Sequence, residues 1–228
     1  MPLSLKRLRF KQLQHHYRHH AYEKRFDWDW DSLHYNRIAV VNLLAAKFPA
    51  CDYLEIGCAA NSLFDAVCAP NKVGVDPMRG GTLRQTSDAF FAENTKKFDV
   101  IFIDGLHEYH QVRKDVENAM RALKPGGWIA LHDMMPAGWM EQHVPMLKSD
   151  VWNGDVWKVA FELSQSPGID FKIIKVDHGV GVFRLDDPHA TLIDREQELS
   201  AKQFAFYYEN FSSLPVVEWH ACQAWLRR

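Results

Sequence analysis

The sequence predicts an α/β fold in which helices cover both faces of a mostly parallel sheet. An apolar run at residues 98–103 indicates a buried strand, and the apolar positions of residues 106–123 recur at the spacing of a helix that lies on a sheet. The motif Lys124-Pro-Gly-Gly127 ends this helix and leads into a second apolar run at residues 128–131. This strand–helix–strand unit, with the alternating strand and helix signals around it, predicts a doubly wound sheet.

The other elements follow in the order of the chain. The helices expected outside this unit occupy residues 3–25, 32–48, 61–67, 89–94 and 151–164. The strands expected outside it occupy residues 53–56, 72–76, 171–176 and 180–184, and a further strand before residue 98 is only weakly marked. The last two strands are expected to pair as an antiparallel hairpin across His178-Gly179.

This pattern divides the chain into three parts. Residues 1–50 are expected to form a helical N-terminal lid or extension, residues 51–186 the central domain, and residues 187–228 a helical C-terminal extension. The length of 228 residues and the 47% hydrophobic content suit one globular domain with extensions.

Charge and cysteine usage restrict the classes of function. The formal net charge of −2 gives no overall excess of positive charge for nucleic-acid binding. The first 25 residues are locally basic, which indicates a solvated helix or, as the alternative, contact with an acidic substrate, a phosphate or a membrane surface. The four cysteines lack the C-x-x-C spacing of metal sites, which favours thiols in a reducing, cytoplasmic compartment. We expect no membrane span and no secretory signal.

Two polar positions follow strands that come early in the expected domain. Glu55-Ile-Gly57 is followed by small residues, which allow a ligand to approach the backbone closely at a strand–helix turn, although a tight turn alone would look similar. Asp76 ends the next strand, 21 positions beyond Glu55. An acid at this place can accept hydrogen bonds from both ribose hydroxyls of an adenosine-bearing cofactor. The alternative role of Asp76 is that of an N-cap before Pro77.

A second group of polar residues follows the strands of the central unit. Asp104 and Asp133 each come at or near the end of a strand, and neighbouring parallel strands lie about 4.8 Å apart. The two carboxylates are therefore expected to meet and to be able to hold one divalent cation. His107 could accept a proton beside them. The alternatives are capping of the following segments by the acids, and a hydrogen bond of His107 to the backbone or to Asp133.

In combination and order, these motifs resemble class I S-adenosylmethionine-dependent methyltransferases, and within them the macrocin-type, metal-dependent sugar O-methyltransferases. The resemblance extends from about residue 53 to residue 185. It rests on Glu55-Ile-Gly57, Gly74-Val-Asp76, the run from Phe98 to His107, Lys124-Pro-Gly-Gly127 and His132-Asp133. It implies a seven-stranded, Rossmann-like sheet with an antiparallel terminal hairpin.

The resemblance also implies roles for individual residues. The implied cofactor-binding residues are Glu55, Gly57, Asn61, Asp76, Ser87, Asp88 and Asp104. Among them, Gly57 would lie under the methionine part, Asp76 would bind the ribose, and Ser87 with Asp88 would lie near the adenine. The implied metal ligands are Asp104, His132 and Asp133, and His107 is the implied general base.

The chain departs from the family pattern at two of these positions. His132 stands where the family has an acid, which would shift the preferred ion from magnesium towards manganese, iron or zinc. Asn61 stands where the family usually has glycine, and asparagine is one of the few other residues that tolerate a positive φ.

The expected reaction is methyl transfer from S-adenosylmethionine to a hydroxyl of a small molecule, with a sugar or glycan precursor as the acceptor and magnesium or manganese as a candidate cofactor. Substrate contacts are expected from Tyr109, Trp152, Asn153 and Asp155, with core packing as the alternative for the tryptophan. Such an enzyme could also form a homo-oligomer.

Two other functions remain open at this point. A nicotinamide-dependent oxidoreductase would use a similar strand–turn–helix, but the chain lacks G-x-G-x-x-G. A catalytically silent cofactor-binding or interaction module is kept open by His132 and Asn61.

Overall fold

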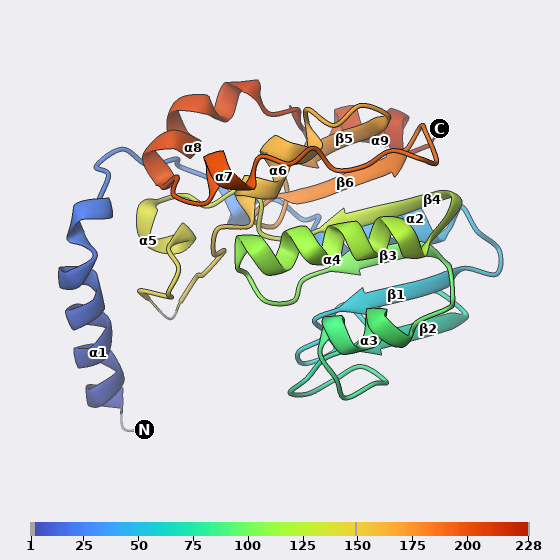
Figure 1. The fold of residues 1–228 in the computed structure, drawn as a ribbon, viewed down its shortest axis with the longest axis horizontal. Helices are drawn as coiled ribbons and strands as arrows, with labels where there is room; N and C mark the ends of the chain where they lie inside the picture. The colour runs from blue at the N-terminus through green and yellow to red at the C-terminus, as the bar shows by residue number, and fades with distance from the viewer. Residues whose placement is uncertain (1–2, 149, 228) are drawn as a thin grey trace.

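A computed structural model describes residues 3–148 and 150–227. Its centre is a seven-stranded sheet with the order β2-β1-β3-β4-β6-β5-β7 in the described residues (Figure 1). The strands are β1 Asp52–Ile56, β2 Asn71–Val75, β3 Phe98–Ile103, β4 Leu123–Leu131, β5 Ile169–Ile174, β6 Val180–Leu185 and β7 Val216–Val217. Strands β2, β1, β3 and β4 are parallel, and β6 is antiparallel to both β4 and β5. The predicted mostly parallel sheet with a terminal hairpin is confirmed.

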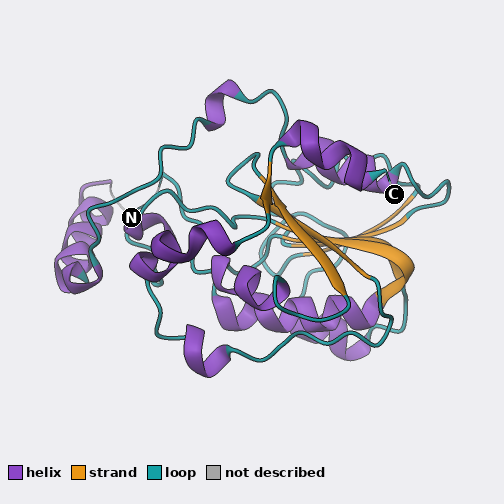
Figure 2. Ribbon diagram, turned by 90° about the horizontal axis from the view of Figure 1, so that it is seen from above, coloured by secondary structure: helices purple, strands orange, loops and turns teal. Residues whose placement is uncertain are grey.

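Helices lie on both faces of this sheet (Figure 2). The helices are α1 Leu3–His16, α2 Arg37–Ala45, α3 Ser87–Glu93, α4 Tyr109–Ala122, α5 Trp139–Gln142, α6 Trp157–Leu163, α7 Glu196–Leu199, α8 Phe204–Asn210 and α9 Trp219–Leu226. One apolar core contains buried residues of α3, α4, α6 and α8, and a second core on the other face contains buried residues of α2 and α9. The doubly wound arrangement therefore buries the sheet from both sides.

The unit β3-α4-β4 follows from its sequence, except that β4 begins at Leu123 and includes Lys124-Pro-Gly-Gly127, which was expected to precede the strand. Every residue of β3 is buried, as expected for a central parallel strand. In α4 the buried residues include Val112, Val116 and Ala119, which lie on one face at helical spacing. The helix begins at Tyr109, whose backbone N–H donates to Oδ1 of Asp155 at 2.7 Å, rather than at the expected residue 106. A side chain remote in the sequence thus satisfies a backbone donor in the first turn of α4.

The two edges of the sheet differ from the sequence-based expectation. The weakly marked strand beyond β2 is reduced to an isolated bridge between Leu83 and Val75, because Gly80 and Gly81 adopt positive φ angles of 69° and 65° that interrupt an extended backbone. At the opposite edge, β7 pairs in parallel with β5. The expected all-helical C-terminal extension therefore contains a strand, formed by two β-branched residues.

Several expected helices also differ from the structure. The helix expected at residues 3–25 ends at His16, and the helix expected at residues 32–48 occupies only Arg37–Ala45. Residues 61–66 form turns instead of a helix, and the turn begins at Asn61, whose φ is +64°. Helix α6 begins at Trp157 instead of residue 151.

The N-terminal helix α1 projects from the side of the molecule (Figure 1), and Gln14 Nε2 donates to the carbonyl of Leu147 at 2.8 Å. None of the described helices is both long and apolar enough to cross a membrane. The cysteines are free: Cys51, Cys58 and Cys222 are buried, and Cys68 is exposed.

Candidate active site

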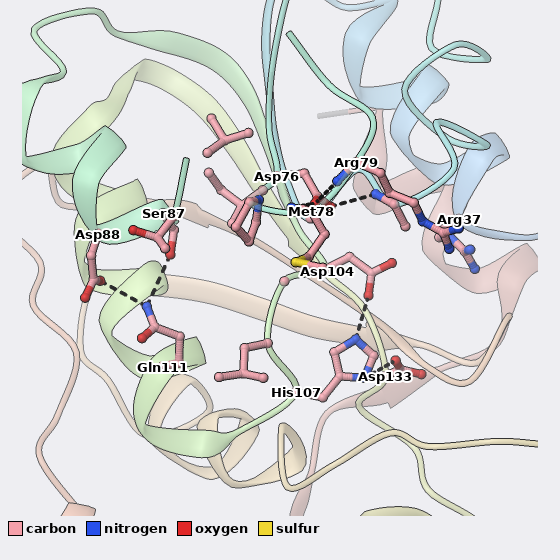
Figure 3. Close-up of a pocket in the computed structure, with 18 residues that line it drawn as sticks. Arg37, Asp76, Met78, Arg79, Ser87, Asp88, Asp104, His107, Gln111 and Asp133 are labelled. Carbon is pink, nitrogen blue, oxygen red and sulfur yellow. Dashed lines mark hydrogen bonds and ion pairs between the residues drawn. The ribbon is translucent and has the colours of Figure 1, made fainter. Parts of the chain in front are cut away.

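A pocket of about 710 Å³ opens at the carboxyl ends of β1, β2 and β3. Its lining contains half of the site residues that the sequence singled out, and Figure 3 shows the side chains around this cavity. The expected site residues that line it are Gly57, Asp76, Ser87, Asp88, Asp104, His107 and Asp133. Because parallel strands bring their carboxyl ends to one edge, residues far apart in the sequence meet there.

Gly57 begins the turn after β1, and a residue with a side chain would not fit its position. Its φ is +88°, and a Cβ built on it would lie 2.0 Å from the carbonyl oxygen of Asp104. The turn after β1 therefore packs directly against the end of β3, and the backbone of this turn forms one wall of the pocket.

Asp76 organises the loop after β2. Its Oδ1 accepts hydrogen bonds from the backbone N–H groups of Met78 at 2.7 Å and Arg79 at 2.8 Å, and its Oδ2 accepts one from Ala59 at 2.8 Å. Burial raises the pKa of this carboxyl, but the three amides outweigh burial and hold the pKa below its ordinary value. The expected capping role is thus present, and Oδ2 still has a lone pair for a ligand.

Ser87 and Asp88 begin α3 on another wall of the pocket. Gln111 of α4 contacts both: its Nε2 donates towards Ser87 Oγ at 3.2 Å and Asp88 Oδ1 at 3.1 Å. These contacts hold the start of α3 against α4.

Asp104, His107 and Asp133 form a tight cluster at the floor of the pocket (Figure 3). One ligand atom from each lies within 4.8 Å of the others, which confirms that the two carboxylates meet. His107 Nε2 lies 3.3 Å from Asp104 Oδ1, and His107 Nδ1 lies 3.1 Å from Asp133 Oδ2 and 2.9 Å from the carbonyl oxygen of Trp152.

The electrostatics of this cluster follow from the geometry. Burial alone would lower the pKa of His107, but the hydrogen bond to Asp104 and the charges of Asp133 and Asp104 raise it to about 9. Burial would raise the pKa of Asp104, but the neighbouring His132 and His107 hold it well below its ordinary value. In this state Asp104 is ionised and the imidazole of His107 carries a proton at neutral pH.

His132 stands behind the cluster and is absent from the pocket lining. Its Nδ1 lies 3.5 Å from Asp104 Oδ1 and 3.3 Å from Asp133 Oδ2. Burial opposes a charge on this ring, but Asp133 and Asp104 outweigh burial and raise the pKa of His132 well above its ordinary value. The three-residue group that could hold a metal contains His107 instead, so a metal-binding role for His132 stays a prediction.

The sequence did not indicate Arg37 or Asp177. Arg37 is the first residue of α2 and lines the pocket, and its Nη1 lies 2.8 Å from Asp177 Oδ2 and 3.2 Å from His132 Nε2. Asp177 has a φ of +47° in the turn between β5 and β6. The one local signal was Asn36, whose side chain accepts from Ile38 N and caps α2. No local pattern connects this helix start to the hairpin.

The expected substrate-binding residues all lie outside the pocket lining, and their roles stay predictions. The Trp152 ring stacks on His107 with centroids 5.3 Å apart. Asn153 is fully buried and donates through Nδ2 to Asp133 Oδ1 at 2.7 Å. Tyr109 is buried, and Asp155 contacts the start of α4 and Lys158.

The remaining two expected cofactor-binding residues also lie outside the lining. Glu55 is buried in β1 and accepts a hydrogen bond of 2.5 Å from the Tyr53 hydroxyl. Burial raises the pKa of Glu55 to about 7, in spite of this hydrogen bond. Asn61 accepts from Gly81 N at 2.7 Å and so holds the loop after β2 in place.

One comparison with known proteins covers the stretch of chain that contains most of this site. Residues 55–134 match the model of a protein family described as a methyltransferase domain. The matched stretch runs from β1 to the residue after Asp133 and includes the cluster and Asp76. The resemblance to methyltransferases is thereby confirmed for this part of the chain, and the sheet around it is of the Rossmann-like type.

Several solved structures resemble the chain at low identity. The O-methyltransferase from Bacillus cereus in complex with S-adenosylhomocysteine is 15% identical, with 65% of this chain and 80% of that chain covered and a TM-score of 0.48. TomG from Streptomyces achromogenes, an O-methyltransferase in complex with S-adenosylmethionine, is 15% identical, with coverages of 65% and 79% and a TM-score of 0.46. The methyltransferase MycE of the mycinamycin pathway is 16% identical, with coverages of 64% and 48% and a TM-score of 0.41. No curated protein matches the sequence significantly.

Proposed function

We propose that this protein is an S-adenosylmethionine-dependent methyltransferase that acts on a hydroxyl group of a small molecule, with a sugar or glycan precursor as the acceptor. One observation carries the proposal: a single pocket joins the Gly57 turn and Asp76 to the Asp104–His107–Asp133 cluster. The family match over the same stretch supports it.

The residues of the pocket fit the cofactor. Its volume of about 710 Å³ is of the size that holds a small ligand. Gly57 presents backbone without a side chain, and the ionised Asp76 keeps an acceptor for a ribose hydroxyl. S-adenosylmethionine, when bound, supplies a methyl group made electrophilic by its sulfonium.

The cluster fits a divalent cation as well. Asp104 and Asp133 offer carboxylate oxygens, and His107 offers an imidazole nitrogen beside them. This mixed donor set suits manganese, iron or zinc better than magnesium, which prefers oxygen. A bound cation would lower the pKa of an acceptor hydroxyl.

His107 is the candidate general base. Its Nδ1 is held by Asp133 and the Trp152 carbonyl, so Nε2 carries the free lone pair. One lone pair cannot bind a cation and accept a proton at once, so His107 acts as the base when Asp104 and Asp133 alone hold the cation. Beside Asp104 and Asp133 the pKa of His107 is about 9. A cation bound to these carboxylates would offset their charge and would lower the pKa of His107 towards the range of an effective base.

The test is release of S-adenosylhomocysteine from S-adenosylmethionine in the presence of a panel of sugars and other hydroxyl compounds, with manganese, magnesium or a chelator. We expect release with at least one acceptor. Asp76→Ala should weaken S-adenosylhomocysteine binding strongly in isothermal titration calorimetry, whereas Asp65→Ala at an exposed position should not. Unchanged affinity in Asp76→Ala would exclude Asp76 as the ribose ligand, and wild-type protein that binds no cofactor would exclude the function.

His107→Ala should abolish turnover while it leaves cofactor affinity unchanged. Undiminished turnover in this variant would exclude His107 as the base.

A further inference from the structure

Arg37 places a fixed positive charge at the wall of the pocket. Its guanidinium lines the cavity, and its side chain is 30% exposed. Oδ2 of Asp177 accepts from Nη1 at 2.8 Å and from the backbone N–H of the same arginine at 3.0 Å. Because one carboxylate oxygen holds both the backbone and the side chain of Arg37, the position of the guanidinium is defined before any ligand binds.

Part of this guanidinium is free to bind a ligand. Among the described residues, its side-chain hydrogen bond and ion pair run through Nη1 to Asp177, and the same Nη1 lies 3.2 Å from His132 Nε2. The Nε and Nη2 groups carry the remaining N–H donors of the planar fork. A fork of this geometry matches a carboxylate with two parallel hydrogen bonds.

The distribution of charge in the pocket indicates which anion this fork would meet. The lysine and arginine side chains of the described lining are Arg37 and Arg79, while four aspartates supply negative charge. Arg79 follows Asp76 and donates its backbone N–H to that residue, so it belongs to the expected ribose end. Arg37 lies close enough to the cluster for the charges of Asp104 and Asp133 to act on it.

The chemistry of the cofactor then orients it. The methyl-bearing sulfonium must lie near the Asp104–His107–Asp133 cluster for transfer, and the amino-acid end of the cofactor is attached directly to this sulfonium. With the ribose at Asp76, the carboxylate of this amino-acid end falls on the Arg37 side of the pocket.

We propose that Arg37 binds the carboxylate of the methionine part of S-adenosylmethionine through Nε and Nη2, and that Asp177 is the residue that positions it. This inference rests on the proposed function and adds a cofactor contact from outside the matched stretch of residues 55–134.

The experiment compares two ligands that differ in the amino-acid end. Full-length protein is titrated calorimetrically, in the presence of a chelator, with S-adenosylhomocysteine and with 5′-methylthioadenosine, which keeps the adenosine and thioether but lacks the amino acid. We expect Arg37→Ala to weaken S-adenosylhomocysteine binding by about 10- to 100-fold, the worth of a charge-assisted hydrogen bond pair. Binding of 5′-methylthioadenosine should change by less than about 2-fold.

The ratio of the two affinities provides the internal control, because general damage to the fold lowers both. Arg79→Ala removes the same charge from the same lining and should leave the ratio unchanged. Arg37→Lys should retain part of the preference for S-adenosylhomocysteine over 5′-methylthioadenosine. Asp177→Asn should reduce this preference, as Arg37→Ala does.

If the ratio is unchanged in Arg37→Ala, the inference is wrong. The cofactor assignment still holds in that case, provided that the wild-type protein binds both ligands. That result would also be expected if Arg37 served an anionic acceptor instead. Wild-type protein that binds neither ligand would overturn the proposed function itself.

Discussion

The side-chain amide of Asn153 donates a hydrogen bond of 2.7 Å to Oδ1 of Asp133, and both side chains are buried. This contact fixes the carboxylate so that Oδ2 points to His107. Asn153→Ala leaves Oδ1 buried without this donor, and we expect the free energy of unfolding to fall by about 1–3 kcal/mol. Urea denaturation measures the loss, and methyl transfer should fall with it. Asn118→Ala on the outer part of α4 should cost much less, and equal losses in the two variants would contradict the role of Asn153.

Two glycines with similar backbone angles offer a matched test of the Gly57 turn. Gly57 and Gly126 have φ angles of +88° and +76°, but a Cβ at Gly126 would meet nothing within 4 Å, whereas one at Gly57 would clash with Asp104. Gly126→Ala should therefore lower the free energy of unfolding by only roughly 1–2 kcal/mol, the cost of placing a residue with a Cβ in the left-handed region. Gly57→Ala should cost more than about 4 kcal/mol. Thermal or chemical denaturation gives both values, and similar costs would show that the turn after β1 can move away from β3.

The buried carboxyl of Asp115 should make the stability of the fold depend on pH. Burial raises the pKa of this carboxyl to about 6 from an ordinary 3.8, and the hydrogen bonds from Ser87 and Gln111 offset burial only in part. Between these two pKa values the folded state binds more protons than the unfolded state, so stability falls as pH rises through this window and stays lower above it. Asp115→Asn should remove this dependence and raise the free energy of unfolding at pH 7 by up to about 3 kcal/mol.

The measurement is denaturation of wild type and variant across the pH range. Asp65→Asn at an exposed position should leave the wild-type curve unchanged. A variant curve that keeps the wild-type fall would show that another group is responsible.

The cluster at the pocket floor predicts stabilisation by metal. Manganese at 100 times its dissociation constant should stabilise the fold by about 2.7 kcal/mol, seen as a rise of the melting temperature. Asp133→Asn and Asp104→Asn should lose the rise, while Asp88→Asn, elsewhere in the same lining, should keep it. Magnesium should give a smaller shift because one donor is an imidazole nitrogen. An equal rise of the melting temperature in the wild type and in Asp133→Asn would show that manganese binds at another site.

The central part of the fold could be predicted because its signals are local. Strand β3 is buried throughout, and the apolar face of α4 repeats at helical spacing, so the unit β3-α4-β4 was expected from the pattern alone. The meeting of Asp104 and Asp133 followed from the pairing of parallel strands. Asp76 and Gly57 were identified because strand ends in such sheets converge on one edge.

The parts that could not be predicted depend on contacts between distant segments. Arg37 and Asp177 meet because α2 and the turn after β5 pack at the same strand ends, which no local pattern reports. The burial of Asn153 behind Asp133 and of Tyr109 against α6 depends on the packing of residues 151–163, so no local pattern reports it. The substrate contacts expected from these two residues stay predictions. Strand β7 has two residues, too few for an alternating pattern.

The position of β7 has a consequence for how the chain is made. In the folded sheet the outer edge of β5 pairs with residues 216 and 217, which are synthesised after all of the other strands. Until then a nascent chain carries an open strand edge of the kind that recruits other chains. In the folded protein the C-terminal segment therefore covers the part of this edge at Ile173 and Ile174.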